Sequence, residues 1–480
     1  MEAPVLPNAS PPSPILPHKG GGSRSSLLLA RAHPLLTVFV LALIVRLINV
    51  GLLEGDNAFF AESDATIYWA EGAALAKGDT FWPTLSSMTY RMPLYPLLLA
   101  GVRSTFGDAP RAAAFIQAAL DAGTCTLIAA LGTLISPLTG LIAGILAAVS
   151  ATLVIFSSQI LTDTLFLFFF TAMLLAGARF LLRPADRLAV IAGLAGGLAL
   201  ATRFGILLLL VAAVPLIFIV ARIEWRSLAR AFAAAILFAI AAAAPVTPIL
   251  LRNAIQYGSF SLATETGGHL AFWIVPLVIQ RADGTPFETS VARMTALYQQ
   301  RLADRGLNED SNPFLLASVK IEVAREEMAH LPPAAFIKSW IEGMAVNLGA
   351  PALLADPRVR ALPKPSFYNT PGASLWERTR VYFFDHPGRY QVLLAVGLAT
   401  MLPFLLLEAV GFVMLARRLP WAAAFAGGLL AYFLLLSGPV ATPKYRLPME
   451  PVLIVLAAIP LAWLGERHRS MPAAACGKAT

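Results

Sequence analysis

Residues 164–182 read TLFLFFFTAMLLAGARFLL, a stretch in which Arg179 is the only charged side chain. A run of this length and composition predicts a helix that crosses a lipid bilayer, which needs about 20 apolar residues. The whole chain is 58% hydrophobic and 13% charged. Soluble proteins carry about 25% charged residues, so this composition excludes a soluble globule.

Similar apolar runs predict an all-α polytopic membrane protein with about ten to twelve transmembrane helices. Ten predicted spans lie at 33–53, 110–134, 137–158, 164–182, 187–202, 204–221, 229–250, 389–416, 420–438 and 447–465. Two further segments leave the number of transmembrane helices open. Residues 93–106 are short for a span, and 336–354 are apolar enough to lie in the membrane interface.

Five regions follow from this assignment. They are a disordered cytoplasmic tail (1–32), a catalytic membrane module (33–251) with a first extracytoplasmic loop and helix pair (54–107), an extracytoplasmic helical cap (252–388), the C-terminal transmembrane helices (389–466) and a second tail (467–480).

Arginine positions orient these spans, because cytoplasmic loops carry an excess of Lys and Arg. With 93–106 as a juxtamembrane segment, every basic cluster between spans is cytoplasmic: Arg183 with Arg187, Arg222 with Arg226 and Arg230, Arg417 with Arg418, and Arg467 with Arg469. We therefore expect a multi-pass membrane protein with both termini in the cytoplasm and with residues 54–107 and 252–388 on the extracytoplasmic side.

The net charge of +8 fits cytoplasmic loops and does not call for nucleic acid as a partner. Cys125 and Cys476 are the two cysteines, too few for a disulfide framework or a cysteine metal site. The sequence has no phosphate-binding loop of the GxxxxGK[ST] type, no HExxH pair and no DxD pair, which argues against ATP-driven pumps, zinc proteases and soluble nucleotide-sugar enzymes.

Two aspartates on the expected outer face are candidate catalytic residues. Asp64 precedes Tyr68 by one helical turn in SDATIYWA, and a shielded carboxylate there can act as a general base. Asp163 lies where one span ends and the next begins, and a carboxylate so near hydrocarbon is usually paired or functional. The alternatives are a solvated loop for Asp64 and a helix N-cap for Asp163.

Cations on the same face form the complementary set, and a lipid phosphate would need such cations. The alternative is that each of these cationic side chains separately reaches a lipid headgroup. His269, with Glu265 nearby, could join a metal or phosphate site or be structural, so a divalent metal stays possible and no cofactor is assigned. The outer-face cations are Arg91, Arg203, Arg252, Lys444 and Arg446.

The order of these motifs resembles the GT-C superfamily of membrane glycosyltransferases, and within it the protein O-mannosyltransferases and the lipid A aminoarabinose or galacturonic acid transferases. The motifs are Arg46 near the end of the first span, Asp64 with Tyr68, the string YRMPLYP from Tyr90 to Pro96, Asp163 before a Leu- and Phe-rich helix, Ala201-Thr202-Arg203, Arg252-Asn253 with Tyr257-Gly258, and Lys444-Tyr445-Arg446-Leu447-Pro448.

The resemblance implies transfer of a sugar from a polyprenyl-phosphate donor to an extracytoplasmic acceptor, such as a protein, lipid A or another envelope glycan, with inversion at the anomeric carbon. It also implies a bacterial inner-membrane protein with its active site on the extracytoplasmic face. By the same resemblance, Asp64 is the base in that site, Asp163 matches the second family acid and Arg91 contacts the lipid phosphate. The chain departs from many relatives in two places: Asp64 follows Ser63 instead of an acid, and Asp163 replaces a Glu.

Other functions for a chain of this kind are a transporter or lipid-linked sugar flippase, an interaction protein with an outer cap, and a lipid-linked oligosaccharide ligase or polymerase. A carrier would place ionisable groups near the bilayer midplane, often in repeated halves. We see most of these groups at helix ends and no internal repeat, so we favour the glycosyltransferase.

Overall fold

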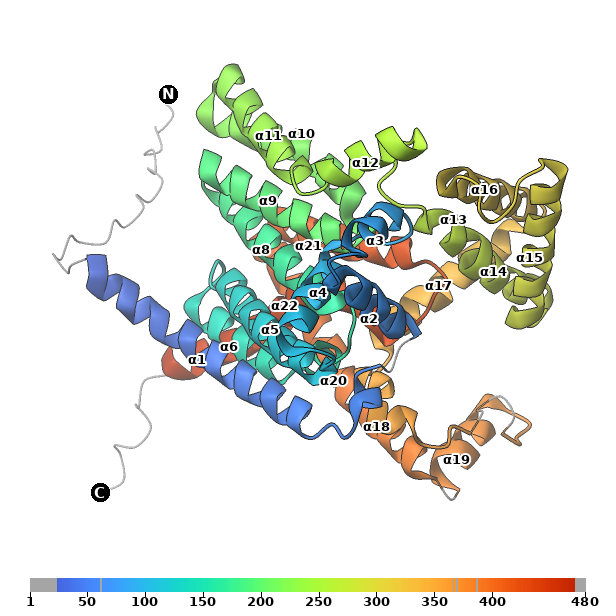
Figure 1. The fold of residues 1–480 in the computed structure, drawn as a ribbon. Helices are drawn as coiled ribbons and strands as arrows, with labels where there is room; N and C mark the ends of the chain where they lie inside the picture. Colours follow the sequence, from blue (N-terminus) through green and yellow to red (C-terminus); the bar gives the residue numbers. More distant parts are fainter. Residues whose placement is uncertain (1–23, 61–62, 366, 368–369, 386, 471–480) are drawn as a thin grey trace, which may run out of the picture.

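The computed structural model describes residues 24–60, 63–365, 367, 370–385 and 387–470 (Figure 1). Helices are the regular secondary structure throughout the described residues, as the composition predicts. The predicted tails lie largely outside this part, at 1–23 and 471–480. Helix α1 (Arg24–Gly51) begins before the predicted start of the first span at residue 33.

Seven helices of the described chain are long and apolar enough to cross a membrane, and the number rises to nine if each of two bent pairs is one span. The predicted number of ten to twelve is not confirmed. The long helices are α1, α5 (Pro110–Gly132), α8 (Asp163–Leu182), α10 (Leu207–Trp225) with the short turn before it, α20 (Arg389–Arg418), α21 (Pro420–Ser437) and α22 (Glu450–Ser470).

The two bent pairs each occupy one predicted span. Helix α6 (Pro137–Val149) meets α7 (Ala151–Ser157) at 50°, and α11 (Leu228–Ala243) meets α12 (Thr247–Tyr257) at 62°. Pro245 lies in the second break, where it cannot continue the helical hydrogen bonds. The predicted spans 137–158 and 229–250 are therefore broken helices.

The two segments whose crossing of the membrane the sequence left open, 93–106 and 336–354, correspond to short helices outside the set of candidate spans. Helix α4 (Leu94–Phe106) has 13 residues and packs against α2 (Ser63–Ala76), while α17 (Pro333–Gly349) packs against α14 (Val275–Asp283) and α21. Neither α4 nor α17 meets the length and hydropathy expected of a span.

Helix α9 (Asp186–Thr202) lies between α8 and α11 and brings its C-terminal end toward the start of α8. Its Gly193 and Gly197 face backbone carbonyls of α11 so closely that a side chain would collide with Phe238 O and Ala242 O. Small residues four apart allow this approach of two backbones in a membrane bundle. The close packing fixes where the residue after α9, Arg203, is placed.

A second core lies outside the membrane bundle and is formed by α13 (Glu265–His269), α14, α15 (Phe287–Asp304) and α16 (Pro313–Ala329), seen at the right of Figure 1. Its buried centre includes Val275, Met294 and Val319. Residues 270–274 form a wider, π-helical turn between α13 and α14. The chain then returns through α18 (Pro357–Arg360) and α19 (Leu375–Phe384) to α20.

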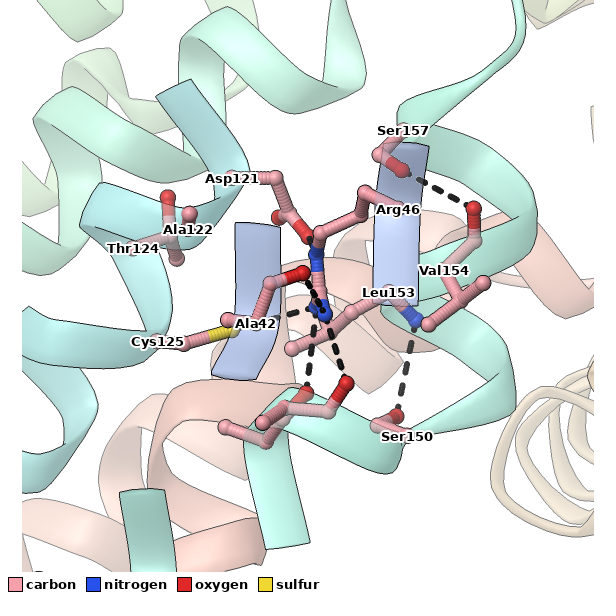
Figure 2. Close-up of polar contacts among 12 residues, drawn as sticks. Ala42, Arg46, Asp121, Ala122, Thr124, Cys125, Ser150, Leu153, Val154 and Ser157 are labelled. Atoms are coloured by element: carbon pink, nitrogen blue, oxygen red, sulfur yellow. Dashed lines mark hydrogen bonds and ion pairs between the residues drawn. The ribbon is translucent and has the colours of Figure 1, made fainter. Parts of the chain in front are cut away.

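Arg46 is buried inside the bundle, where α1 meets α5 and the break between α6 and α7 (Figure 2). Its Nε donates to Asp121 Oδ2 at 2.6 Å and its Nη2 donates to Cys125 Sγ at 3.1 Å. The remaining donors reach the carbonyl oxygens of Ala42, Ala147 and Ala148. All five guanidinium N–H groups are thus used, and two of them satisfy carbonyls at the end of α6.

Candidate active site

Helix α2 presents three polar side chains along one side. Asp64, Tyr68 and Glu71 stand four and three residues apart, which places them on one helical face. The helix predicted around SDATIYWA is therefore present. Tyr68 is 9% exposed, and burial raises the pKa of its phenol.

Asp64 lies between two cations contributed by distant parts of the chain. Arg91 Nη2 donates to Asp64 Oδ1 at 2.8 Å, and Lys444 Nζ lies 3.6 Å from Asp64 Oδ2. The Asp64 side chain keeps 38% of its surface exposed, whereas Arg91 keeps 13% and Lys444 16%. The carboxylate is therefore the accessible member of the group, with its cations held against the protein.

Aromatic rings hold Arg91 in place. Its guanidinium carbon lies 4.9 Å from the Tyr68 ring centroid and 5.4 Å from that of Tyr90, within the range of cation–π attraction. Burial raises the pKa of Tyr90, an effect strengthened by the negative charge of Glu265 and reduced by Arg91. Both phenols therefore stay neutral and can donate hydrogen bonds at neutral pH.

Asp163 forms the second acidic centre. It is the first residue of α8, and its carboxylate accepts a hydrogen bond from Arg203, which follows the end of α9. The Asp163 side chain is 4% exposed and that of Arg203 is 25% exposed. Thr162, not Asp163, occupies the N-cap position, and no side-chain cap is formed there. The N-cap alternative is therefore wrong, although a first-turn acid still suits the helix dipole.

Glu265, at the start of α13, connects the two acidic centres electrostatically. Burial raises the pKa of its carboxyl group, and the positive charges of Arg203, Arg91 and Lys444 oppose that rise. One carboxylate thus senses cations from both centres. The backbone supports this placement, because Thr264 N donates to Thr89 O at 2.9 Å. We call Asp64, Arg91, Lys444, Asp163, Arg203 and Glu265 the two-acid cluster.

His269 lies one turn after Glu265 on the same short helix. Burial lowers the pKa of its imidazole, and the positive charge of Lys444 lowers it further. The ring is therefore neutral at neutral pH and borders the cluster. Among the described residues, no group of three or more His, Cys, Asp or Glu side chains is placed to hold a metal ion.

Three of the predicted site residues point elsewhere. Arg46 is enclosed by the partners described above. Arg252 donates to Leu85 O at 2.6 Å and to its neighbour Asn253, which ties α12 to α3 (Phe81–Ser87). Arg446 is 4% exposed and is held between Glu408 and Glu450. The expected five-cation group is thus reduced to Arg91, Arg203 and Lys444.

Sequence reasoning also missed contributors to this region. Glu71 is partly buried, no group in the described part of the chain donates to its Oε2, and burial raises the pKa of its carboxyl group. Its helical spacing from Asp64 and Tyr68 is the signal that would have found it. Outside this region, sequence reasoning also missed Asp121 and Glu408, the partners of the buried Arg46 and Arg446, although each is a rare acid within an apolar run.

Comparison with known proteins gives one family match. Residues 90–250 match the family model described as dolichyl-phosphate-mannose-protein mannosyltransferase. This segment contains Arg91, Asp163 and Arg203, whereas Asp64 and Lys444 lie outside it. A comparison with curated protein sequences gives no match.

Two crystal structures of ArnT from Cupriavidus metallidurans are similar to the chain at 15% identity. The structure bound to undecaprenyl phosphate aligns over 93% of this chain and 79% of ArnT with a TM-score of 0.35. The apo structure aligns over 91% and 78% with a TM-score of 0.32. The family match, over residues 90–250, supports the resemblance to the GT-C membrane glycosyltransferases that the motifs predict.

Proposed function

We propose that the protein transfers a sugar from a polyprenyl-phosphate donor to an extracytoplasmic acceptor in one inverting displacement, with Asp64 as the general base. The observation that carries the proposal is the position of Asp64, an accessible carboxylate with Arg91 at 2.8 Å and Lys444 at 3.6 Å. The name of the matched family, which refers to a dolichyl-phosphate sugar, supports the choice of donor.

The donor phosphate has a natural place in this arrangement. A phosphate leaving group departs as a stable anion, so it needs cations more than it needs a proton donor. Arg91 and Lys444 lie on either side of Asp64, and both can turn to phosphate oxygens when the donor arrives. This exchange leaves the Asp64 carboxylate free to accept the proton of the acceptor hydroxyl or amine.

The reaction then balances without further groups. Asp64 takes the acceptor proton while the acceptor atom forms a bond to the anomeric carbon. The bond between that carbon and the phosphate oxygen breaks, and the electron pair leaves with the polyprenyl phosphate. Asp163, held by Arg203, is the second acid near the reacting centre and orients the acceptor or the sugar hydroxyls.

The helix ends support an extracytoplasmic site. Asp163 begins α8, Arg203 follows α9 and Lys444 precedes α22, so all three lie at one end of the bundle. At the opposite ends, Arg183 follows α8, Arg226 follows α10 and Arg418 is the last residue of α20. The positive-inside rule makes that second end cytoplasmic. Membrane-impermeant thiol reagents should therefore label cysteines placed within 54–92 and 260–380 from outside the cell.

The decisive experiment is transfer by purified protein in vesicles that contain a labelled polyprenyl-phosphate sugar. Asp64→Asn keeps the size of the side chain but removes its basicity, and it should lower the rate by about 10²–10⁴. Asp108→Asn is the matched control, because Asp108 also accepts from an arginine, Arg103 at 2.7 Å, but lies outside the cluster.

Three results are informative. Loss of transfer in Asp64→Asn with normal transfer in Asp108→Asn supports the proposal. Near-normal transfer by folded Asp64→Asn protein would move the base to Asp163 or Asp56. Movement of the labelled lipid between leaflets without any glycosyl transfer would favour the alternative, a flippase.

A further inference from the structure

Gln117, in the middle of α5, is a buried amide whose hydrogen bonds are all satisfied by protein groups. It is 1% exposed. Its Nε2 donates to Ser157 O at 2.9 Å and to Gln159 O at 2.7 Å, and its Oε1 accepts from the Tyr95 hydroxyl at 2.6 Å. A buried amide with every donor and its acceptor engaged has one orientation, because each alternative would leave polar atoms unpaired.

One end of this arrangement holds the segment that leads to Asp163. Residues 158–162 join α7 to α8, and Gln117 donates hydrogen bonds to backbone carbonyls at the beginning of this segment. The segment is also tied to the short helix before Asp64: Gln159 Nε2 donates to Ala58 O at 3.2 Å, and Ile160 N donates to Phe59 O at 3.0 Å.

The other end reaches the side chains around Asp64. The Tyr95 ring is fully buried and meets the Tyr68 ring edge to face, with centroids 5.4 Å apart. Tyr68 in turn lies under the guanidinium of Arg91, the partner of Asp64. A continuous set of buried contacts therefore joins the backbone before Asp163 to the ion pair of Asp64.

We propose that Gln117 and Tyr95 are positioning residues that hold the Asp163 segment and the Asp64 helix at a fixed distance from each other. The catalytic consequence rests on the proposed function, in which both acids act on one donor–acceptor pair. Misplacement of a reacting group by about 1 Å costs about 10² in rate. The hydrogen bonds of Gln117 and Tyr95 in the described chain go to each other and to the backbone of residues 157 and 159, not to the cluster acids, so both residues act through the elements that they hold.

The test compares Tyr95→Phe and Gln117→Met with Tyr382→Phe. Tyr95→Phe keeps the ring contact with Tyr68 and removes only the bond to Gln117. Tyr382 is the matched control, because it is a buried tyrosine with one bond, to Pro365 O at 3.1 Å, in another part of the chain. We expect kcat per folded protein to fall about 10- to 100-fold in the first two variants and to stay at the wild-type value in the control.

Two further measurements separate positioning from a general loss of stability. The double variant should be no slower than Gln117→Met alone, because both changes break the same connection, whereas independent defects would add. Hydrogen exchange should accelerate in residues 157–162 and in α2 of both single variants, while exchange in α15 and α16 stays unchanged.

Unchanged exchange in residues 157–162 overturns the inference, and so does wild-type kcat per folded protein in Gln117→Met. If the wild-type chain transfers no sugar from a polyprenyl phosphate, the proposed function fails. The exchange experiment then still decides by itself whether Gln117 and Tyr95 hold the two segments together.

Discussion

Arg46 provides a sharp test of the difference between a site residue and a residue that holds the bundle together. Its side chain is 0% exposed, that of Asp121 is 2% exposed, and the two are joined at 2.6 Å. Arg46→Met keeps much of the side-chain volume but removes the cation and all five hydrogen bonds. Asp121 is then left in the bundle without a partner (Figure 2).

The expected cost follows from these contacts. Removing one member of a buried ion pair costs about 3–5 kcal/mol, because the other charge stays buried without compensation. The carbonyls of Ala147 and Ala148 lose their donors as well, and each unsatisfied buried group costs about 1–3 kcal/mol where water cannot reach it. We therefore expect Arg46→Met to destabilise the protein by at least about 3 kcal/mol.

A double-mutant cycle in detergent micelles measures this coupling. Asp121→Leu alone leaves the cation unpaired, whereas Arg46→Met with Asp121→Leu leaves neither charge. The double variant should therefore be more stable than the sum of the two single changes, by about 0.5–3 kcal/mol in unfolding by a denaturing detergent. Additive effects would refute a structural pair. A fully stable Arg46→Met protein without transferase activity would return Arg46 to the active site.

Two further predictions concern the cluster. Arg91→Ala should lower transfer by about 10²–10³ at equal amounts of folded protein, because the proposed function gives Arg91 a charged contact to the departing phosphate. A wild-type rate would move that contact to Arg203 or Lys444. Glu265 has a pKa above its ordinary value of 4.5 because it is buried, so the native state keeps its proton where the unfolded chain has lost it. Stability should therefore fall as pH rises through this weakly acidic window. Glu265→Gln should reduce that fall in melting curves, leaving the part that comes from the buried Glu71; an unchanged pH dependence would contradict the cause.

The positions of the long helices could be read from the sequence. The predicted span 164–182 corresponds to α8 (Asp163–Leu182), and 420–438 corresponds to α21 (Pro420–Ser437). The predicted span 187–202 is the helix α9, which lies outside the set of helices long and apolar enough to span. Agreement is close because a run of apolar residues in lipid must satisfy its backbone hydrogen bonds within the run, which makes the helix a local property. The bend between α11 and α12 was missed, although Pro245 marks it.

The pairing of charges could not be read in this way. Arg46, Arg91 and Arg446 look alike in the sequence, since each is an isolated arginine beside apolar residues. Their distant partners are Asp121, Asp64 and Glu408, which lie 75, 27 and 38 residues away, although Arg446 also pairs with Glu450 one helical turn later. The sequence alone determined that the protein is a helical membrane protein, and it indicated Asp64 and Asp163 as candidate acids on the expected extracytoplasmic face. Only the tertiary structure decided which arginines remain near an accessible carboxylate, because burial penalises any charge whose partner is not brought to it by packing.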